Sequence, residues 1–443
     1  MSRPVVLVTA PVQTRSGYGN HSRDICTALI ELDKYDVKIN PVRWGSTSKT
    51  ALEENNPKHQ EIQRRFLTSP SLPTQPDLHI HIVVPNEFHA IAKKNVGITA
   101  GIETTIPVPQ WVEGTNRMDL NIFTSEFSRQ GFKSAEFEAQ DKPGHLVKMN
   151  KPSEVLFEGV DTDVYKEVNK FSKGVSDLFS KIKEDYCFLY TGHWLQGNLG
   201  EDRKDTGMLV KIFLETFKNQ DNQPALVLKT SGANFSILDR EEILKKIRKI
   251  KQDKQAKFPN IYLIHGDFTD SEMNELYNHP KVKTHITLTH GEGFGRPLLE
   301  AAQSGKPIVA PGWGGQVDFL HRNYSVLLPG SLTKVPKSAF PKEMFFESDE
   351  NKWFTANYNV ASQVMKDVVN NYSKYLVKGK QLQLYTKSEF SLEKMKEKLD
   401  KILSPLIDTI PTQVDLKLPK LQKIDNSKLK LPKLEKGVRW KNK

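Results

Sequence analysis

Cysteine is scarce in this sequence and long apolar runs are missing, and both features narrow the classes of protein to consider. The 443 residues include two cysteines, Cys26 and Cys187, which lack the spacing of a disulfide framework or a metal site and are expected to be small buried residues. No apolar run approaches the ~20 residues that span a bilayer. The opening MSRPVVLVTAP has no signal-peptide layout. We therefore expect a soluble, cytoplasmic protein without a membrane span.

The formal net charge of +11 is unevenly placed. Residues 411–443 hold ten Lys or Arg and three Asp or Glu, which leaves the rest of the chain nearly balanced. This segment also contains a near-repeat, LKLPKLQK (416–423) and LKLPKLEK (429–436), and the proline in each copy opposes a helix. We expect a disordered basic tail, which binds DNA, binds a protein partner such as a replication protein, or only keeps the end of the chain solvated.

Apolar strand patterns alternate with helical patterns along most of the chain. The first expected series of strands covers residues 5–10, 37–42, 79–85, 96–101, 120–125 and part of 153–165, and the second covers 186–194, 225–231, 260–266, 284–290 and 307–311. Expected helices include one after the glycine loop at 16–24, one at 240–253 and one at 391–407. The alternation predicts an α/β fold of two Rossmann-like, doubly wound domains joined near residue 160.

The stretch THGEGFGRPLLEAAQSGKPIVAPGWGG, residues 289–315, carries the clearest chemical signal. It predicts a helix with Pro297 at the first position, Glu300 in the first turn and Glu292 in the preceding loop. A helix N-terminus suits a phosphate, and ionised carboxylates accept hydrogen bonds from sugar hydroxyls. The stretch therefore predicts a nucleotide-sugar site. The alternative, that the glutamates only favour the helix dipole, does not account for the spacing of the whole string.

The string EGFGRPLLEAAQSGKP resembles the signature of glycosyltransferase family 4, including its Glu-x7-Glu pair. The resemblance implies the GT-B fold, in which two Rossmann-like domains face a cleft. It also implies transfer with retention, no metal, and no cofactor besides a nucleoside-diphosphate sugar, with a UDP-sugar favoured. The expected parts are an acceptor domain (1–160), a nucleotide-sugar domain (161–375), helices that cross back to the first domain (376–410) and the tail (411–443).

The resemblance also assigns roles to individual residues. Glu300 would bind the ribose, Glu292 the hydroxyls of the donor sugar, and Lys204 with Arg203 the diphosphate. A solvated helix start is the alternative for this basic pair, but positive charge is unfavourable there, which favours a bound anion. The further donor-binding candidates are Gly17, Gly19, Lys229, Gly293, Phe294 and Gly295. The acceptor-side candidates are His21, Glu103 and Thr104, although a solvent-facing strand end explains Glu103 as well.

The acceptor is open at this stage. The SGYGNHSRD and TAGIETT segments resemble family members encoded by large DNA phages or viruses, which implies a modified base such as a hydroxymethylated pyrimidine in phage DNA and a location in the host cytoplasm. A cell-surface glycan or lipid-linked saccharide is the alternative acceptor for such a hexosyl- or pentosyltransferase. A non-catalytic nucleotide-sugar or carbohydrate-binding protein is a different class, against which intact Glu292, Glu300 and Lys204 argue. The DTD at 161–163 falls in a linker common in the family, so no metal site is expected.

Overall fold

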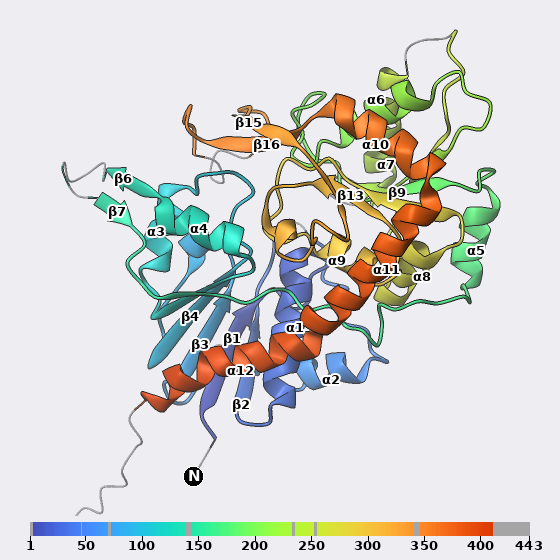
Figure 1. The fold of residues 1–443 in the computed structure, drawn as a ribbon. Helices are drawn as coiled ribbons and strands as arrows, with labels where there is room; N and C mark the ends of the chain where they lie inside the picture. Colours follow the sequence, from blue (N-terminus) through green and yellow to red (C-terminus); the bar gives the residue numbers. More distant parts are fainter. Residues whose placement is uncertain are drawn as a thin grey trace, which may run out of the picture. The chain divides into compact units, whose positions relative to one another are not determined.

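The computed structural model describes residues 3–45, 47–69, 72–138, 144, 146–232, 235–251, 255–340 and 346–410. Residues up to Ile410 form one compact unit. The basic tail expected at 411–443 lies outside the described residues, so its predicted disorder and its partners stay predictions. The compact unit has two lobes, each built on its own parallel sheet (Figure 1).

The first lobe is a parallel α/β sandwich at the N-terminal end of the chain. Its sheet has the strand order β2-β1-β3-β4-β5-β8 among the described residues, and all pairs are parallel. The elements are β1 (Val5–Ala10), α1 (Gly17–Glu31), β2 (Asp36–Pro41), α2 (Pro57–Gln63), β3 (Leu78–Ile82), η1 (Pro85–Glu87), β4 (Lys94–Thr99), α3 (Pro109–Thr115), β5 (Leu120–Phe123), α4 (Glu126–Ser134), β6 (Glu136–Glu138), β7 (Leu146–Lys148) and β8 (Ser153–Val155).

The second lobe repeats this plan. Its main sheet has the order β11-β10-β9-β12-β13-β14 within the described ranges, again with parallel pairs throughout. The elements are α5 (Lys173–Ser180), β9 (Cys187–His193), α6 (Thr206–Phe217), β10 (Ala225–Ser231), α7 (Ile237–Ile250), β11 (Ile261–Ile264), α8 (Asp270–Asn278), β12 (Val282–Ile286), α9 (Arg296–Ala302), β13 (Ile308–Pro311), η2 (Gly315–Asp318), β14 (Val326–Leu328), β15 (Gly330–Lys334), β16 (Lys352–Ala356), α10 (Tyr358–Asn370) and α11 (Tyr372–Glu389).

A final helix, α12 (Leu392–Asp408), returns the chain to the first lobe. Its buried face, Met395, Leu399 and Leu403, belongs to the same apolar core as β1 and α1, because it presents an apolar side chain about every fourth residue. Figure 1 shows α11 and α12 running from the second lobe to the first. The C-terminal helix therefore completes the first lobe.

The chain crosses between the lobes at two places that touch each other. Val160, in the segment that leaves β8, donates its N–H to Phe390 O at 2.9 Å and accepts from Leu392 N at 2.9 Å. Gly159 is packed so closely that a side chain there would come within 2.7 Å of Leu392 Cα. Both crossings therefore form a single joint between the lobes.

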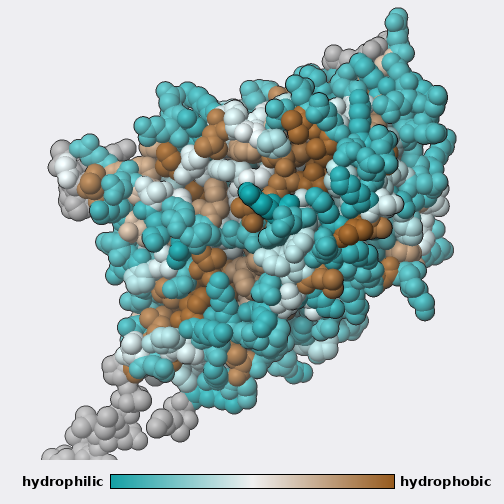
Figure 2. Space-filling model, in the orientation of Figure 1, coloured by the Kyte–Doolittle hydropathy of each residue, from teal (hydrophilic) through white to brown (hydrophobic). Residues whose placement is uncertain are grey.

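Several inner strands of the two sheets are mainly apolar and buried. Every position of β3, β5 and β10 is buried, because helices cover both faces of a parallel sheet. Both cysteines are buried and free, as expected. Figure 2 shows a largely hydrophilic surface with apolar side chains in several separate patches. The prediction of two Rossmann-like domains, each built on a parallel sheet, is confirmed.

Candidate active site

The signature loop leads from β12 into α9, and one glycine sets its geometry. Gly295 has φ of +95°, a left-handed conformation that favours glycine, and it forms the N-cap of α9. Arg296 is then the first helical residue and Pro297 the second, so the prediction that Pro297 opens the helix is off by one position. Glu300 is the fifth helical residue and lies in the second turn rather than the first. The loop residue Glu292 precedes the helix, as predicted.

The two predicted basic residues are paired with carboxylates. Lys204 Nζ lies 2.5 Å from Glu292 Oε2, and the two side chains are 13% and 16% exposed. Arg203 forms an ion pair with Glu103, which lies in the loop after β4 of the first lobe. Both basic residues precede α6, which begins at Thr206. Protein carboxylates therefore balance both cations, and their binding of a diphosphate stays a prediction.

The carboxyl ends of β9 and β10 gather positive charge around His193. The ring of His193 accepts from or donates to Ser231 Oγ at 3.2 Å. Burial, together with neighbouring cations, lowers the pKa of His193 to about 4, so the ring is neutral at neutral pH. These cations are Arg203, Lys204 and Lys229. His193 is a site residue that the sequence analysis did not select.

Lys229, the secondary donor candidate, lies deeper than the basic pair. It is 9% exposed, and its ammonium donates to Gly266 O at 2.7 Å and lies 4.6 Å from the centre of the Phe268 ring. Burial lowers the pKa of Lys229 to about 8. The positive charge of Lys229 acts on His193 together with the charges of Arg203 and Lys204.

Arg203 remains charged although it is largely buried. Burial by itself lowers the pKa of its guanidinium, but the carboxylates of Glu103 and Glu292 outweigh that effect and raise it. The backbone also fixes the loop that carries Arg203, because His290 N donates to Arg203 O at 3.1 Å. The basic loop and the signature loop thus form one unit.

Glu300 lies in a second cluster beside the first. Arg296 Nε donates to Glu300 Oε1 at 2.8 Å, and the hydroxyl of Tyr277 donates to Glu300 Oε2 at 3.3 Å. Burial raises the pKa of Glu300 to about 7, and the positive charge of Arg296 opposes this shift. The carboxyl is therefore divided between its neutral and ionised forms near neutral pH.

The predicted glycines differ in what surrounds them. A Cβ on Gly19 would lie 2.2 Å from Thr14 O, so Gly19 is required by the packing of its own loop, whereas the space around Gly17 is open within 4 Å. A Cβ on Gly293 would lie 2.4 Å from Ala100 O of the first lobe. The Phe294 side chain is 2% exposed in the core of the second lobe, so only its backbone is free to face a donor.

The three acceptor-side candidates lie in different environments. Thr104 is buried and donates to Ile106 O at 3.2 Å, and Glu103 is engaged by Arg203. His21 is 3% exposed, and among the described residues neither of its ring nitrogens has a hydrogen-bond partner. Burial lowers the pKa of His21 to about 3, so it is neutral.

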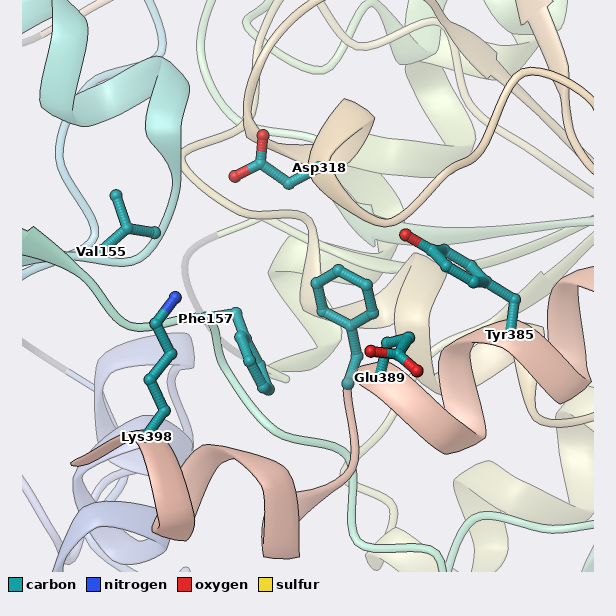
Figure 3. Close-up of a pocket in the computed structure, with 7 residues that line it drawn as sticks. Val155, Phe157, Asp318, Tyr385, Glu389 and Lys398 are labelled. Atoms are coloured by element: carbon teal, nitrogen blue, oxygen red, sulfur yellow. The ribbon is translucent and has the colours of Figure 1, made fainter. Parts of the chain in front are cut away.

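A separate cavity of about 440 Å³ opens beside the joint between the lobes (Figure 3). Its ionisable side chains are Asp318, Glu389 and Lys398, and Asp318 also accepts the N–H of Glu126 at 2.8 Å. Figure 3 shows these groups around the rings of Phe157 and Tyr385. The cavity lies apart from the basic cluster around His193.

The described residues bear on two further expectations, which concern a metal site and a membrane span. That part of the chain holds no group of three or more His, Cys, Asp or Glu side chains arranged around a metal position. Within the DTD segment, Asp161 pairs with Lys58 at 2.8 Å. None of the helices in the described ranges has the length and apolarity needed to span a bilayer.

Comparisons with known proteins identify the fold. The sequence matches no protein-family model and no curated protein, so membership of glycosyltransferase family 4 stays a prediction. HepE from Anabaena, solved with UDP-glucose, is similar at a TM-score of 0.60 and 14% identity, over 91% of this chain and 100% of that one. Sucrose-phosphate synthase from Thermosynechococcus elongatus gives 0.61 and 12%, over 92% and 100%. A glycosyltransferase from Rickettsia africae gives 0.59 and 13%, over 92% and 100%.

These similarities extend over nearly the whole compact unit. At such low identities they establish the fold, which is GT-B, while chemistry has to be argued from the site itself. The two lobes bring Glu292, Lys204 and Arg203 into one cluster, and place Glu300 in another on the same loop and helix. Their roles toward a donor stay predictions.

Proposed function

We propose that the protein is a glycosyltransferase that takes a sugar from a nucleoside-diphosphate sugar. One observation carries the proposal: Lys204 pairs with Glu292 and Arg203 pairs with Glu103 in the largely buried loops where the lobes meet, and Lys229 adds positive charge to that of this pair at His193. Three cations at the carboxyl ends of parallel strands are suited to a diphosphate, since ligands of open α/β sheets bind at this edge. The carboxylates of Glu292 and Glu300 then serve the hydroxyls of the sugar and the ribose.

The ion pairs of the site support this proposal. Glu292 holds the ammonium of Lys204, and Glu103 holds the guanidinium of Arg203, so both cations are oriented before a donor arrives. A diphosphate replaces one carboxylate contact at each cation with a phosphate contact. Glu292 is thereby released to accept hydrogen bonds from the donor sugar. Preorganised charge of this kind stabilises a leaving diphosphate without reorganisation during the reaction.

We further propose transfer with retention and without a metal. The bond between the anomeric carbon and the diphosphate oxygen breaks, and the acceptor oxygen bonds to the same face of that carbon. The acceptor proton passes to the departing phosphate oxygen. Lys204 and Arg203 balance the charge that grows on the diphosphate, which is the role a divalent cation plays in other sites.

Thermal unfolding in EDTA tests the donor. A ligand that binds only the folded state raises the melting temperature, so UDP-sugars, and less so other nucleotide-sugars, should stabilise the protein in the absence of metal. A Lys58→Met variant, which loses the Asp161 ion pair far along the linker, is the matched control and should respond like the wild type. Stabilisation that requires Mg²⁺ or Mn²⁺ would exclude the metal-free mechanism.

Turnover distinguishes an enzyme from a binding protein. The released UDP should accumulate slowly with water as the acceptor and faster with the true acceptor. Tight binding of a UDP-sugar without any UDP release, over every acceptor tried, would instead indicate a non-catalytic nucleotide-sugar-binding protein.

For the acceptor, we propose a base in DNA, such as a hydroxymethylated pyrimidine of phage DNA. The feature that favours it is the basic segment 411–443, with ten Lys or Arg against three acids, because cationic segments neutralise DNA phosphates. Mass spectrometry of nucleosides from DNA, with and without the gene, tests this acceptor. Unchanged nucleosides together with a changed surface glycan would establish the alternative acceptor.

A further inference from the structure

Arg296 contacts carboxylates from three separate parts of the chain. Its Nε donates to Glu300 Oε1 of the same helix at 2.8 Å, and its Nη1 donates to Asp24 Oδ2 of α1 in the first lobe. The same Nη1 lies 3.8 Å from Glu158 Oε2, in the crossing between the lobes. The four side chains are between 7% and 13% exposed. The guanidinium and the three carboxyl groups form a buried cluster that joins both lobes and the crossing.

Helix stability does not explain an arginine at this position. Arg296 is the first residue of α9, where the positive end of the helix dipole disfavours a cation. An arginine four residues before a glutamate is also the less favourable order for a helical ion pair. Arg296 is therefore held in place by the carboxyl groups of the cluster. Its contribution lies in how it orients these groups and shifts their pKa values.

Arg296 fixes one side of the Glu300 carboxylate. Arg296 binds one carboxylate oxygen and the Tyr277 hydroxyl binds the other, so the plane of the carboxylate is fixed. Each oxygen retains a lone pair for a further donor. Burial raises the pKa of Glu300 to about 7, and Arg296 opposes that rise. The arginine thus favours the ionised form, which accepts two hydroxyl hydrogen bonds.

We infer that Arg296 is a positioning residue that orients the Glu300 carboxylate toward the nucleoside of the donor, and that it does so fully only while it also holds Asp24 of the first lobe. This inference rests on the proposed function. Because coupling between two sites is reciprocal, a bound nucleotide favours the arrangement in which Arg296 reaches Asp24. Asp24 belongs to α1, the helix that starts at the glycine loop. Donor binding is thereby coupled to the acceptor lobe through one side chain.

Calorimetric titration with UDP tests the inference in a mutant cycle. Arg296→Met should weaken UDP binding by about tenfold or more, and Arg296→Lys should recover part of the loss. Asp24→Asn should weaken binding by a smaller factor although Asp24 makes no contact with Glu300. The double variant Arg296→Met/Asp24→Asn should bind no more weakly than Arg296→Met, because Asp24 acts through the arginine.

Arg15 provides a matched control. It pairs with Asp267 at 3.1 Å, and this ion pair also joins the first lobe to the second. Arg15→Met should leave UDP affinity within about twofold of the wild type and should combine additively with Arg296→Met. An equal loss in both variants would mean that any broken contact between the lobes has this effect, and it would overturn the role of Arg296.

The dependence of UDP affinity on pH distinguishes a positioning role of Arg296 from a merely structural one, because a structural role would not shift this dependence. UDP affinity of the wild type should rise as the pH increases through about 7, where Glu300 ionises. In Arg296→Met the rise should move to higher pH, since burial is then unopposed. The other ionisable groups that face Glu300 or Arg296 stay in place: Asp24 and His21 of α1, Glu158 of the crossing, Tyr165, and Asp270 and Tyr277 of α8.

The outcomes separate the two proposals. If the wild type binds UDP and Arg296→Met binds it with the same affinity and pH profile, the inference is overturned and the proposed function stands. Additive losses from Arg296→Met and Asp24→Asn overturn the coupling to the first lobe. If no nucleoside diphosphate or nucleotide-sugar binds the wild type, both proposals fail. Should Arg296→Met not fold by circular dichroism, Arg296→Lys with Asp24→Asn completes the same cycle.

Discussion

The ammonium of Lys204 lies 2.5 Å from Glu292 Oε2, so the group expected to bind phosphate and the group expected to bind the sugar neutralise each other. Both side chains are largely buried, and a hydrogen bond between charged groups there contributes more than one in water. A donor must therefore offer each of them a better partner. This requirement leads to predictions about both residues.

Lys204→Met should weaken the binding of UDP by about tenfold to a hundredfold, the range for a lost charged hydrogen bond, and should leave the binding of uridine unchanged. The reason is that only UDP carries the phosphates that Lys204 faces. Calorimetric titration with both ligands measures the contrast. If uridine and UDP lose affinity by the same factor, Lys204 supports the shape of the site and does not bind the diphosphate.

The two glutamates of the signature should differ when their charge is removed. Glu300→Gln should weaken the binding of UDP itself, because the ribose loses an ionised acceptor. Glu292→Gln should leave UDP binding near normal, or slightly tighter because Lys204 is freed, and should reduce turnover by about tenfold or more. Affinity and rate measured on the same preparations decide this. Equal losses of UDP affinity in both variants would contradict the division of roles.

Glu158 should make the fold less stable as the pH rises. Burial raises the pKa of Glu158 to about 8, with Arg296 opposing, so the folded protein holds a proton that the unfolded chain has lost. A folded-state pKa above the unfolded value gives stability that is complete at low pH and is lost as the pH rises through about 8. Glu158→Gln imitates the neutral acid and avoids this loss.

The stability gained by Glu158→Gln over the wild type should therefore grow by about 1 kcal/mol or more between about pH 6 and pH 8. Urea unfolding at several pH values measures it. Glu154→Gln, at an exposed position of the neighbouring strand β8, is the control and should show no such trend. A difference that does not change with pH would mean that Glu158 is ionised in the folded state.

Two glycines of the candidate site should respond in opposite ways to alanine. A Cβ at position 17 meets open space, and alanine favours a helix, so Gly17→Ala should keep or raise the melting temperature. A Cβ at position 293 would lie 2.4 Å from Ala100 O, which is backbone and cannot move away alone. Gly293→Ala should therefore lower the melting temperature and the activity together. Tolerance of both substitutions would show that the lobes stand further apart in solution.

The basic tail should affect only long DNA substrates. Deletion of residues 411–443 removes ten Lys or Arg, so activity on duplex DNA should fall and its dependence on salt should become weaker. Hydrolysis of the donor should be unchanged. Replacing the leucines of both LKLPKL copies by serine, with every lysine kept, separates the alternatives: retained DNA affinity with lost activity in cells indicates a protein partner. An intact protein without DNA affinity at low salt would remove the DNA acceptor.

The sequence was sufficient to predict local structure, such as strands and glycine-containing loops. It was insufficient to predict contacts between residues that are far apart in the chain. Strands such as β1 and β10 begin with four consecutive apolar residues, and their parallel sheets follow from alternation with helices. The loop before α9 follows from its glycines. By contrast, the ion pairs Arg203–Glu103 and Arg296–Asp24 join residues that are 100 and 272 positions apart. Periodicity and spacing carry no information about which loops of two lobes meet.

What the sequence did not reveal about the site has the same origin. Phe294 stands between two glycines, which suggests a ligand contact, and only the fold shows that its ring packs 5.1 Å from that of Phe319 in the core. His193 follows an apolar strand like many other polar residues, and only the fold reveals that Arg203, Lys204 and Lys229 act on its pKa. Arg296 occupies a position that the family signature leaves open, so the motif gave no reason to select it. Each of these facts depends on the assembled lobes.

The pairing of Val160 with Phe390 and Leu392 has a consequence for how the molecule can be rebuilt. The chain enters and leaves the second lobe at neighbouring points, so the second lobe is a cassette inserted into an otherwise continuous first lobe. Splicing at these two points would exchange the cassette for that of another GT-B protein. Chimaeras made at this seam would test whether the two lobes select the nucleotide-sugar and the acceptor separately, and α12 would stay with the first lobe, to which it belongs.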